Sequence, residues 1–198
     1  MAEKSTPKRT TLSVLAAAVL ATALPIAVPS PAEAAPVGRV CFFLNEQGAN
    51  GAGHVAWAVR DPKNTSRWVW GSTDNAEGDT ATLPGHDNGS WSQSGTWKQL
   101  RGEAAGKKAI SLRDYESYRC INTAGGDLAA AQRTYRNMKD NGYQVLYNNC
   151  LTKTIAIFRK YSPALSSKHL PNGQKIAPKY YFYRMLNDAP GWEDARPY

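Results

Sequence analysis

Residues 54–72 read HVAWAVRDPKNTSRWVWGS, and this stretch decides the fold. Two runs rich in valine and tryptophan, at 54–59 and 67–70, flank the turn-forming residues Asp61-Pro62-Lys63-Asn64. Apolar runs of this length on either side of a Pro/Asn turn are typical of an antiparallel β-hairpin. We therefore expect paired strands at 54–59 and 67–72.

Further strands are expected on both sides of this hairpin. The run VCFFL at 40–44 is short and apolar, and YQVLY at 143–147 alternates in the way a strand does. Weaker patterns predict strands at 109–112 and 115–121. The polar, glycine-rich stretch 75–109 predicts a long excursion that contains one or two short strands.

Two helices are predicted, at 127–141 and 150–161, and a short third one at 181–186. Asp127 is a good helix N-cap, apolar residues recur at helical spacing after it, and Gly142 suits the left-handed position beyond a helix end. Strands followed by helix, strand and helix indicate the α+β class. The expected architecture is a small, mostly antiparallel sheet packed against helices on one side.

The chain has 198 residues, which is the size of one domain. Basic residues precede the apolar run LSVLAAAVLATALPIAV at 12–28, and Ala32-Glu33-Ala34 follows it, which predicts a secretory signal peptide at 1–34. A membrane anchor is the alternative, but the run is short and prolines interrupt its far end. We expect an exported single domain at 35–198, without a membrane span and with a proline- and aromatic-rich tail from about residue 164.

The chain carries 24 Lys+Arg against 16 Asp+Glu, a formal net charge of +8. A basic exported domain is attracted to anionic surroundings such as a cell-wall polymer, an acidic lipid surface or nucleic acid. The basic residues are scattered and form no continuous helical stripe, which argues against specific nucleic-acid binding. Weak affinity for an anionic wall polymer is the expectation that remains.

The three cysteines allow at most one intramolecular disulfide, and an oxidising exterior permits it. We favour a bridge between Cys41 and Cys120, and the sequence leaves the other pairings open. The remaining Cys150 stands where a strand gives way to a helix. Such a cysteine is usually buried and inert, but the positive end of a helix also lowers a thiol pKa and activates it.

An activated cysteine needs a histidine partner, and the chain has three histidines, His54, His86 and His169. His86 and His169 lie in expected loops, whereas His54 begins a predicted strand that would hold it rigidly. His54 is therefore the candidate general base, with a structural, hydrogen-bonded histidine as the alternative. No two histidines have the spacing of a metal site, so neither a metal nor a cofactor is expected.

These residues resemble a known family. Gly53-His54-Val55-Ala56-Trp57 on a strand, followed later by Asn149-Cys150-Leu151-Thr152 at the start of a helix, resembles the circularly permuted branch of the papain-like NlpC/P60 superfamily. The Asn-Cys-x-Thr stretch is also similar to the Asn-Cys-Thr-Thr motif of bacterial periplasmic and lipoprotein members. The resemblance implies a permuted papain-like fold and a thiol hydrolase or acyltransferase for amide or ester bonds, with Cys150 as nucleophile and His54 as base.

Members of the family also carry a third polar residue that orients the imidazole. A hairpin that turns near residues 63–64 places His54 opposite about Thr73, so Ser72 or Asp74 is expected in that role, and the charged Asp74 is the stronger orienter. The sequence departs from the family here, because neither His, Asn nor Gln stands on the 67–74 strand. Asn149 is expected either to stabilise an oxyanion or to cap the helix.

The sequence thus predicts a secreted cysteine hydrolase of amidase or peptidase type, acting on cell-envelope peptide or amide bonds. One alternative is a secreted glycan- or wall-binding module without enzyme activity, which would use Trp68, Trp70, Trp91 and Trp97. Trp57 and one of the 68/70 pair are expected in the core. A secreted toxin or effector with the same thiol chemistry is another alternative. A catalytic pair requires His54 and Cys150 near hydrogen-bonding distance, which a binding module does not need.

Overall fold

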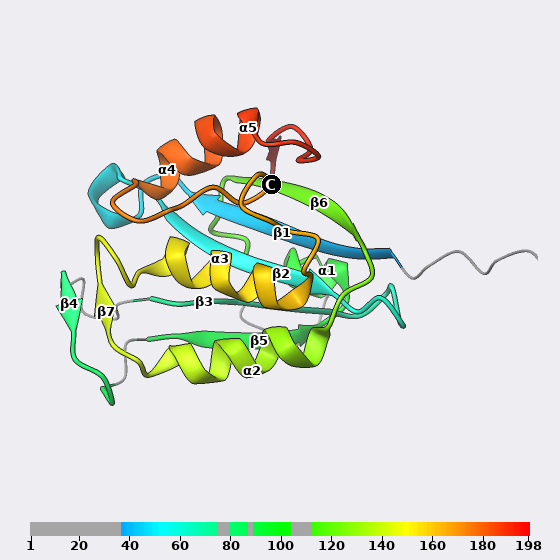
Figure 1. Cartoon of the computed structure of the whole chain (residues 1–198), viewed down its shortest axis with the longest axis horizontal. Coiled ribbons are helices and arrows are strands. Elements are labelled where there is room, and N and C mark those ends of the chain that lie inside the picture. The colour runs from blue at the N-terminus through cyan, green and yellow to red at the C-terminus, as the bar shows by residue number, and fades with distance from the viewer. Residues whose placement is uncertain (1–36, 75–79, 87–88, 104–111) are drawn as a thin grey trace, which may run out of the picture. The chain divides into compact units, whose positions relative to one another are not determined.

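The computed structural model describes residues 37–74, 80–86, 89–103 and 112–198 (Figure 1). A six-stranded antiparallel sheet of order β5-β3-β2-β1-β6-β8 forms its centre. Its strands are β1 (Val37–Asn45), β2 (His54–Arg60), β3 (Trp68–Ser72), β5 (Trp91–Gly95), β6 (Ser117–Ala124) and β8 (Arg196–Pro197). The expected α+β class with an antiparallel sheet is confirmed. The expected signal peptide at 1–34 lies outside the described residues.

The predicted hairpin is present as β2 and β3. Asp61 closes its turn, because its backbone N–H bonds the Arg67 carbonyl at 2.9 Å and its carboxylate accepts the Lys63 N–H at 2.9 Å. The observed register pairs Ala56 with Ser72. Continued by two residues, this register sets His54 opposite Asp74. The expectation that His54 lies opposite Thr73 was therefore wrong by one residue. A one-residue shift of register moves a side chain to the other face of a sheet.

The two main helices are α2 (Leu128–Lys139) and α3 (Cys150–Tyr161), and they lie side by side over one face of the sheet (Figure 1). As predicted, Asp127 caps α2 by accepting the Ala130 N–H at 2.8 Å, and Gly142 has a left-handed φ of 82°. Under these helices, Phe42 of β1 contacts Phe158 of α3 edge-to-face, with ring centroids 4.8 Å apart. This aromatic and aliphatic packing fixes α3 against the strands.

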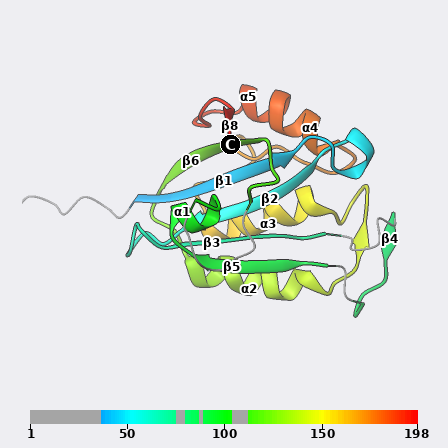
Figure 2. The same ribbon diagram turned by 180° about the vertical axis from the view of Figure 1, so that it is seen from behind.

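The opposite face of the sheet is also covered, here by the short helix α1 (Trp97–Leu100) and neighbouring loops (Figure 2). The expectation of helices on one side only was therefore wrong. Trp68 and Trp70 both lie buried on this face, 5% and 0% exposed. Residues two apart on a strand point to the same side, so the expectation that only one of them enters the core was also wrong.

The remaining elements are short. The loop after β1 contains the turn η1 (Ala49–Gly51), and β4 (Ala81–Thr82) pairs with β7 (Tyr143–Gln144). The strand expected at 143–147 ends at residue 144, because the next three residues form an exposed turn. Of the strand expected at 109–112, only residue 112 is described, and it lies in a bend.

The tail folds back as α4 (Pro178–Tyr180), the π-helical turn η2 (Tyr181–Met185) and α5 (Leu186–Asp188). This segment contains the short helix expected at 181–186. Within the described residues, no helix has the length and apolar character needed to cross a membrane.

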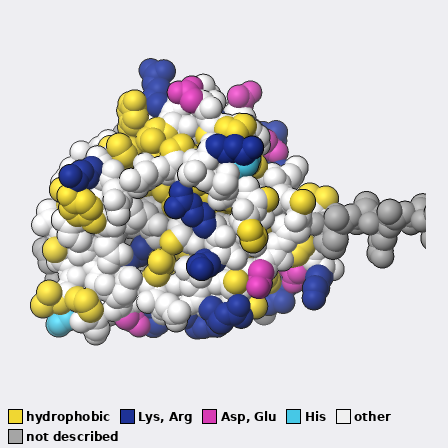
Figure 3. Space-filling model, in the orientation of Figure 1, with side chains coloured by type: hydrophobic (Ala, Val, Ile, Leu, Met, Phe, Trp, Pro, Cys, Tyr) yellow, Lys and Arg dark blue, Asp and Glu magenta, His cyan; other side chains and the backbone are white. Residues whose placement is uncertain are grey.

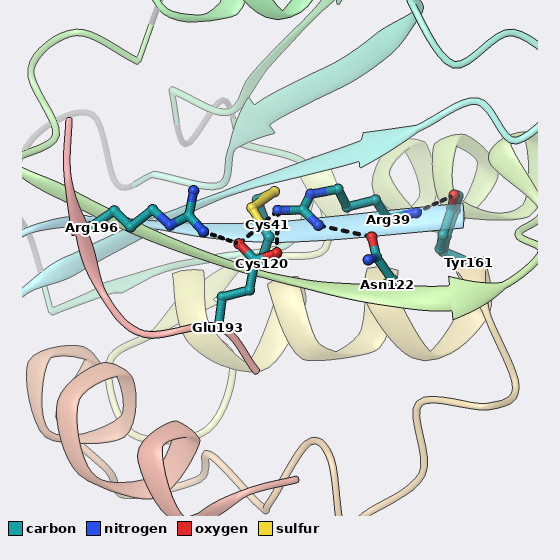
Figure 4. Close-up of a disulfide and its surroundings, with 7 residues drawn as sticks. All are labelled: Arg39, Cys41, Cys120, Asn122, Tyr161, Glu193 and Arg196. Carbon is teal, nitrogen blue, oxygen red and sulfur yellow. Dashed lines mark hydrogen bonds and ion pairs between the residues drawn. A yellow bond between two sulfur atoms is a disulfide. The ribbon is translucent and has the colours of Figure 1, made fainter. Parts of the chain in front are cut away.

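A disulfide joins Cys41 of β1 to Cys120 of β6, as the sequence analysis favoured (Figure 4). The two cysteines face each other in the strand register, with Cα atoms 4.1 Å apart. Beside them, the Arg39 guanidinium donates to both oxygens of Glu193 at 2.6 and 2.7 Å. The bridge joins β1 to β6, and the ion pair ties β1 to the C-terminal segment.

Replacing Cys41 and Cys120 together by alanine should lower the free energy of unfolding by about 4 kcal/mol, because the bridge closes a long loop in the unfolded chain. Urea denaturation followed by tryptophan fluorescence measures the change. Dithiothreitol should destabilise the wild type by a similar amount and leave the double variant unaffected. Equal transition midpoints for wild type and variant would show that the bridge adds no stability.

Candidate functional site

Cys150 is the first residue of α3, and it is the free cysteine of the described chain. The helix begins with a capping box, in which Asn149 Oδ1 accepts the Thr152 N–H at 3.0 Å and Thr152 Oγ1 accepts the Asn149 N–H at 2.9 Å. The Cys150 side chain therefore lies at the positive end of a twelve-residue helix, where unpaired amides favour an anion. It is 2% exposed.

His54, the first residue of β2, is held by two side chains from the strand next to it. Its Nε2 lies 2.7 Å from Ser72 Oγ and 2.5 Å from Asp74 Oδ1. Ser72 donates its own hydroxyl hydrogen to Asp74 at 2.5 Å, so its oxygen accepts from the imidazole. Both of the residues that the sequence offered for the orienting role thus contact His54, and the aspartate is in direct ion-pair geometry.

The Cys150 thiol and the His54 imidazole are hydrogen-bonded to each other. Because His54 Nε2 is taken by Ser72 and Asp74, Nδ1 is the nitrogen left for the sulfur. The backbone N–H of Val55 also donates to the Cys150 sulfur. The start of α3 and the start of β2 therefore meet at one hydrogen-bonded pair of side chains.

The charged forms of Cys150 and His54 stabilise each other, and the pKa of each side chain shows this. Burial alone would lower the pKa of His54, but the Cys150 thiolate and Asp74 outweigh it and raise that pKa to about 10. Burial would raise the pKa of Cys150, but the positive charge and hydrogen bond of His54, with the Val55 N–H, lower it. Both shifts favour the charged forms, a thiolate paired with an imidazolium, and the thiolate is the nucleophilic form of a cysteine.

Asp74 has a third partner, which the sequence analysis assigned elsewhere. Trp91, the first residue of β5, pairs with Ser72 in the sheet and hydrogen-bonds the Asp74 carboxylate. Burial disfavours the charged carboxylate, yet the contacts with His54, Ser72 and Trp91 keep its pKa below the ordinary value. Asp74 therefore stays ionised and keeps His54 charged.

Tyr143 and Lys153 also belong to the site, and the sequence analysis missed them. The Tyr143 hydroxyl contacts both the backbone N–H and the sulfur of Cys150, and burial raises its pKa, so it remains protonated. Lys153 lies one turn into α3, 1% exposed, and donates to the carbonyls of Met138 and Gly142 at 2.9 and 2.7 Å. It thereby anchors the loop that brings Tyr143 to the cysteine.

The lysine ammonium lies 5.9 Å from the centre of the Tyr143 ring. Burial lowers the pKa of Lys153 to about 8. Its two carbonyl contacts are hydrogen bonds donated by the lysine nitrogen, and they stabilise the charged ammonium. Nothing in the periodicity of α3 distinguishes this lysine, because a lysine three residues after a helix start is ordinarily solvent-exposed.

Asn149 acts as the helix cap, one of the two roles expected for it. Besides accepting the Thr152 N–H, it donates through Nδ2 to the Val145 carbonyl at 2.5 Å. Its side-chain oxygen and one amide hydrogen are thus engaged in ordering the turn before α3. The Asn149 side chain is 3% exposed and stabilises the start of the helix that carries Cys150.

The other two histidines lie away from this pair. His86 is exposed in the turn after β4, and His169 is bonded through Nδ1 to Ser166 Oγ at 3.2 Å in the tail. Across the described ranges there is no cluster of three or more His, Cys, Asp or Glu side chains that could hold a metal ion.

The tryptophans named for a glycan-binding surface have other positions. Trp68 and Trp70 are buried, and Trp97 packs against Trp68 with ring centroids 4.7 Å apart. Trp91 is half-buried and bonded to Asp74. Basic side chains are scattered over the face seen in Figure 3 and do not gather into one stripe.

Comparisons of the chain with models of known protein families, with curated proteins and with solved structures find no match.

Replacing Asp74 by asparagine should lower the pKa of His54 from about 10 toward its ordinary value of 6.5, because the carboxylate and its hydrogen bond favour the imidazolium. In the wild type the ring stays charged at neutral pH and loses its proton as pH rises through about 10. NMR of the His54 ring Cε1–H signal over pH measures both midpoints. Asp188→Asn, an exposed acid on α5, is the matched control and should leave His54 unchanged.

Proposed function

We propose that this protein is a cysteine hydrolase of the circularly permuted papain-like type, with Cys150 as nucleophile and His54 as base. The observation that carries the proposal is the Cys150–His54 hydrogen bond at the start of α3, with the other imidazole nitrogen held by Asp74. A binding module has no need of a buried cysteine and histidine in this contact. The order of a histidine strand before a cysteine helix supports the permuted papain-like assignment.

The proposed reaction begins with attack of the Cys150 thiolate on the carbonyl carbon of an amide. The negative charge that develops on the carbonyl oxygen is stabilised by donors at the start of α3 and by the protonated Tyr143 hydroxyl next to the sulfur. The His54 imidazolium gives its proton to the leaving amine, which departs as the carbon–nitrogen bond breaks. This step leaves an acyl group on the Cys150 sulfur.

Water completes the proposed cycle. Neutral His54 removes a proton from a water molecule, whose oxygen attacks the thioester carbon, and the carbon–sulfur bond breaks to release a carboxylic acid and the thiolate. Asp74 and Ser72 keep the imidazole oriented through both steps and stabilise its charged form. An amine or alcohol in place of water would make the same site an acyltransferase.

The proposed substrate is a peptide or amide of the cell envelope, reached after export. The N-terminal signal-peptide pattern, the Cys41–Cys120 disulfide and the formal charge of +8 support this location. The disulfide suits an oxidising compartment, and the basic charge favours an anionic wall. The arrangement of the tryptophans gives no comparable support to a glycan-binding module.

Incubation with p-nitrophenyl acetate should produce nitrophenolate and an acetyl group on Cys150, located by mass spectrometry of the digested protein. His54→Ala should slow acylation by at least about a hundredfold, which is the usual contribution of a general base. Cys150→Ser should also slow acylation by at least about a hundredfold, because it removes the thiolate nucleophile. His86→Ala, at an exposed loop histidine, is the control and should react as the wild type does. Acetylation elsewhere, or acylation of Cys150 at an unchanged rate without His54, would contradict the proposal.

A further inference from the structure

A cavity of about 660 Å³ lies between the loop that precedes His54 and the helical C-terminal segment. Its volume lies within the range of small-molecule binding sites. One wall is formed by small residues of the loop, and the other carries cationic and aromatic side chains. The lining includes Gly51, Ala52, Lys179, Tyr180, Tyr183 and Arg184.

Backbone contacts fix the shape of this cavity. The Lys179 N–H donates to the Ala52 carbonyl at 3.0 Å, which joins the two walls. Gly53 has a φ of 89°, and a Cβ there would stand 2.8 Å from the Lys179 nitrogen. Only glycine accommodates both the left-handed backbone and this close approach. These backbone contacts therefore set the spacing between the two walls of the cavity.

The same loop connects the cavity to the cysteine–histidine pair. Its last residue, Gly53, directly precedes His54 in the chain. At its other end Gly48 packs against the histidine, because an added Cβ would lie 2.4 Å from the His54 Cβ. A ligand in the cavity therefore contacts a loop that touches His54 at both ends.

The two cations that line the cavity, Lys179 and Arg184, differ in their ion pairing. Lys179 Nζ lies 2.8 Å from Glu46, and the Tyr183 hydroxyl donates to the same carboxylate at 2.6 Å. The hydrogen bond from Lys179 lowers the pKa of Glu46, so the two charges cancel at neutral pH. Arg184 is exposed and forms no ion pair within the part of the chain that the structure describes.

An exposed aromatic ring completes the lining. Tyr180 is 58% exposed and lies in the same wall as Arg184. A guanidinium binds a carboxylate through two parallel hydrogen bonds, and a tyrosine ring offers a flat apolar surface. We propose that this cavity binds a carboxylate attached to a flat apolar group, with Arg184 contacting the anion and Tyr180 packing on the apolar part.

Two sources of such a ligand share this chemistry, namely a small organic acid and the C-terminal residue of a peptide. If the ligand is part of a substrate, the cavity would hold its carboxylate end against the loop that leads into His54, and that link rests on the proposed function. Binding itself does not depend on catalysis.

The test is a titration of ¹⁵N-labelled protein with N-acetyl-L-tyrosine, followed by NMR. Saturable shifts are expected at residues 51–52 and 177–184. The neutral N-acetyl-L-tyrosinamide, and the variant Arg184→Gln with the acid, should each bind about tenfold or more weakly, because a charge-assisted contact is lost. Arg136→Gln, at an exposed arginine of α2, is the matched control and should bind as the wild type does.

The tripeptide Gly-Gly-Tyr distinguishes the two sources. If Gly-Gly-Tyr binds more tightly than N-acetyl-L-tyrosine does, the ligand is a peptide C-terminus. If it binds more weakly or equally, the ligand is a small organic acid. Equal affinity for the acid and its amide, or binding unaffected by Arg184→Gln, would overturn the proposal.

Cys150→Ser separates this inference from the proposed function. The variant should bind N-acetyl-L-tyrosine as the wild type does, because Cys150 does not line the cavity. Loss of acylation with retained binding would leave the cavity proposal standing. Normal acylation of the wild type without saturable binding would refute the cavity alone.

Discussion

The hydrogen bond between the Cys150 thiol and the His54 imidazole is the contact on which the site depends. It joins the first residue of α3 to the first residue of β2, and burying two charges there is costly unless each has further partners. The Val55 N–H and the helix terminus provide them for the sulfur, and Asp74 provides one for the ring. Removing either charge would leave the other buried with only these further partners to stabilise it.

The sheet supplies most of the geometry around this contact. Strand β3 carries Ser72 and leads into Asp74, and the edge strand β5 adds Trp91, so three adjacent strands orient one imidazole. Both faces of the sheet are packed. The Cys41–Cys120 bridge joins β1, the strand next to β2, to β6. Rigid strands of this kind hold catalytic groups more accurately than loops do.

Local sequence patterns predicted the hairpin and both long helices, which follow from periodicity, capping residues and turn chemistry acting over a few residues. Cys150 and His54 were chosen because they begin an expected helix and an expected strand, whereas Ser72 and Asp74 came from the family resemblance combined with the hairpin. The Cys41–Cys120 pairing was favoured while the other pairings stayed open. The predicted register of the β2–β3 hairpin was wrong by one residue, because a loop as long as 61–67 can connect two strands in more than one register. Trp91, Tyr143 and Lys153 were missed because their roles depend on contacts between distant segments. Lys153 in particular is a buried lysine on a helix face that the sequence marks as ordinary.

The most direct test is iodoacetamide labelling of the folded protein across pH, with each cysteine quantified by mass spectrometry in the wild type and in His54→Ala. The thiolate–imidazolium account predicts that Cys150 alone reacts. Its apparent pKa should lie well below the ordinary thiol value of about 8.5, and removing His54 should raise it. If Cys150 stays unreactive while the protein is folded, or titrates near 8.5 in both proteins, the pair is not an activated nucleophile and its base.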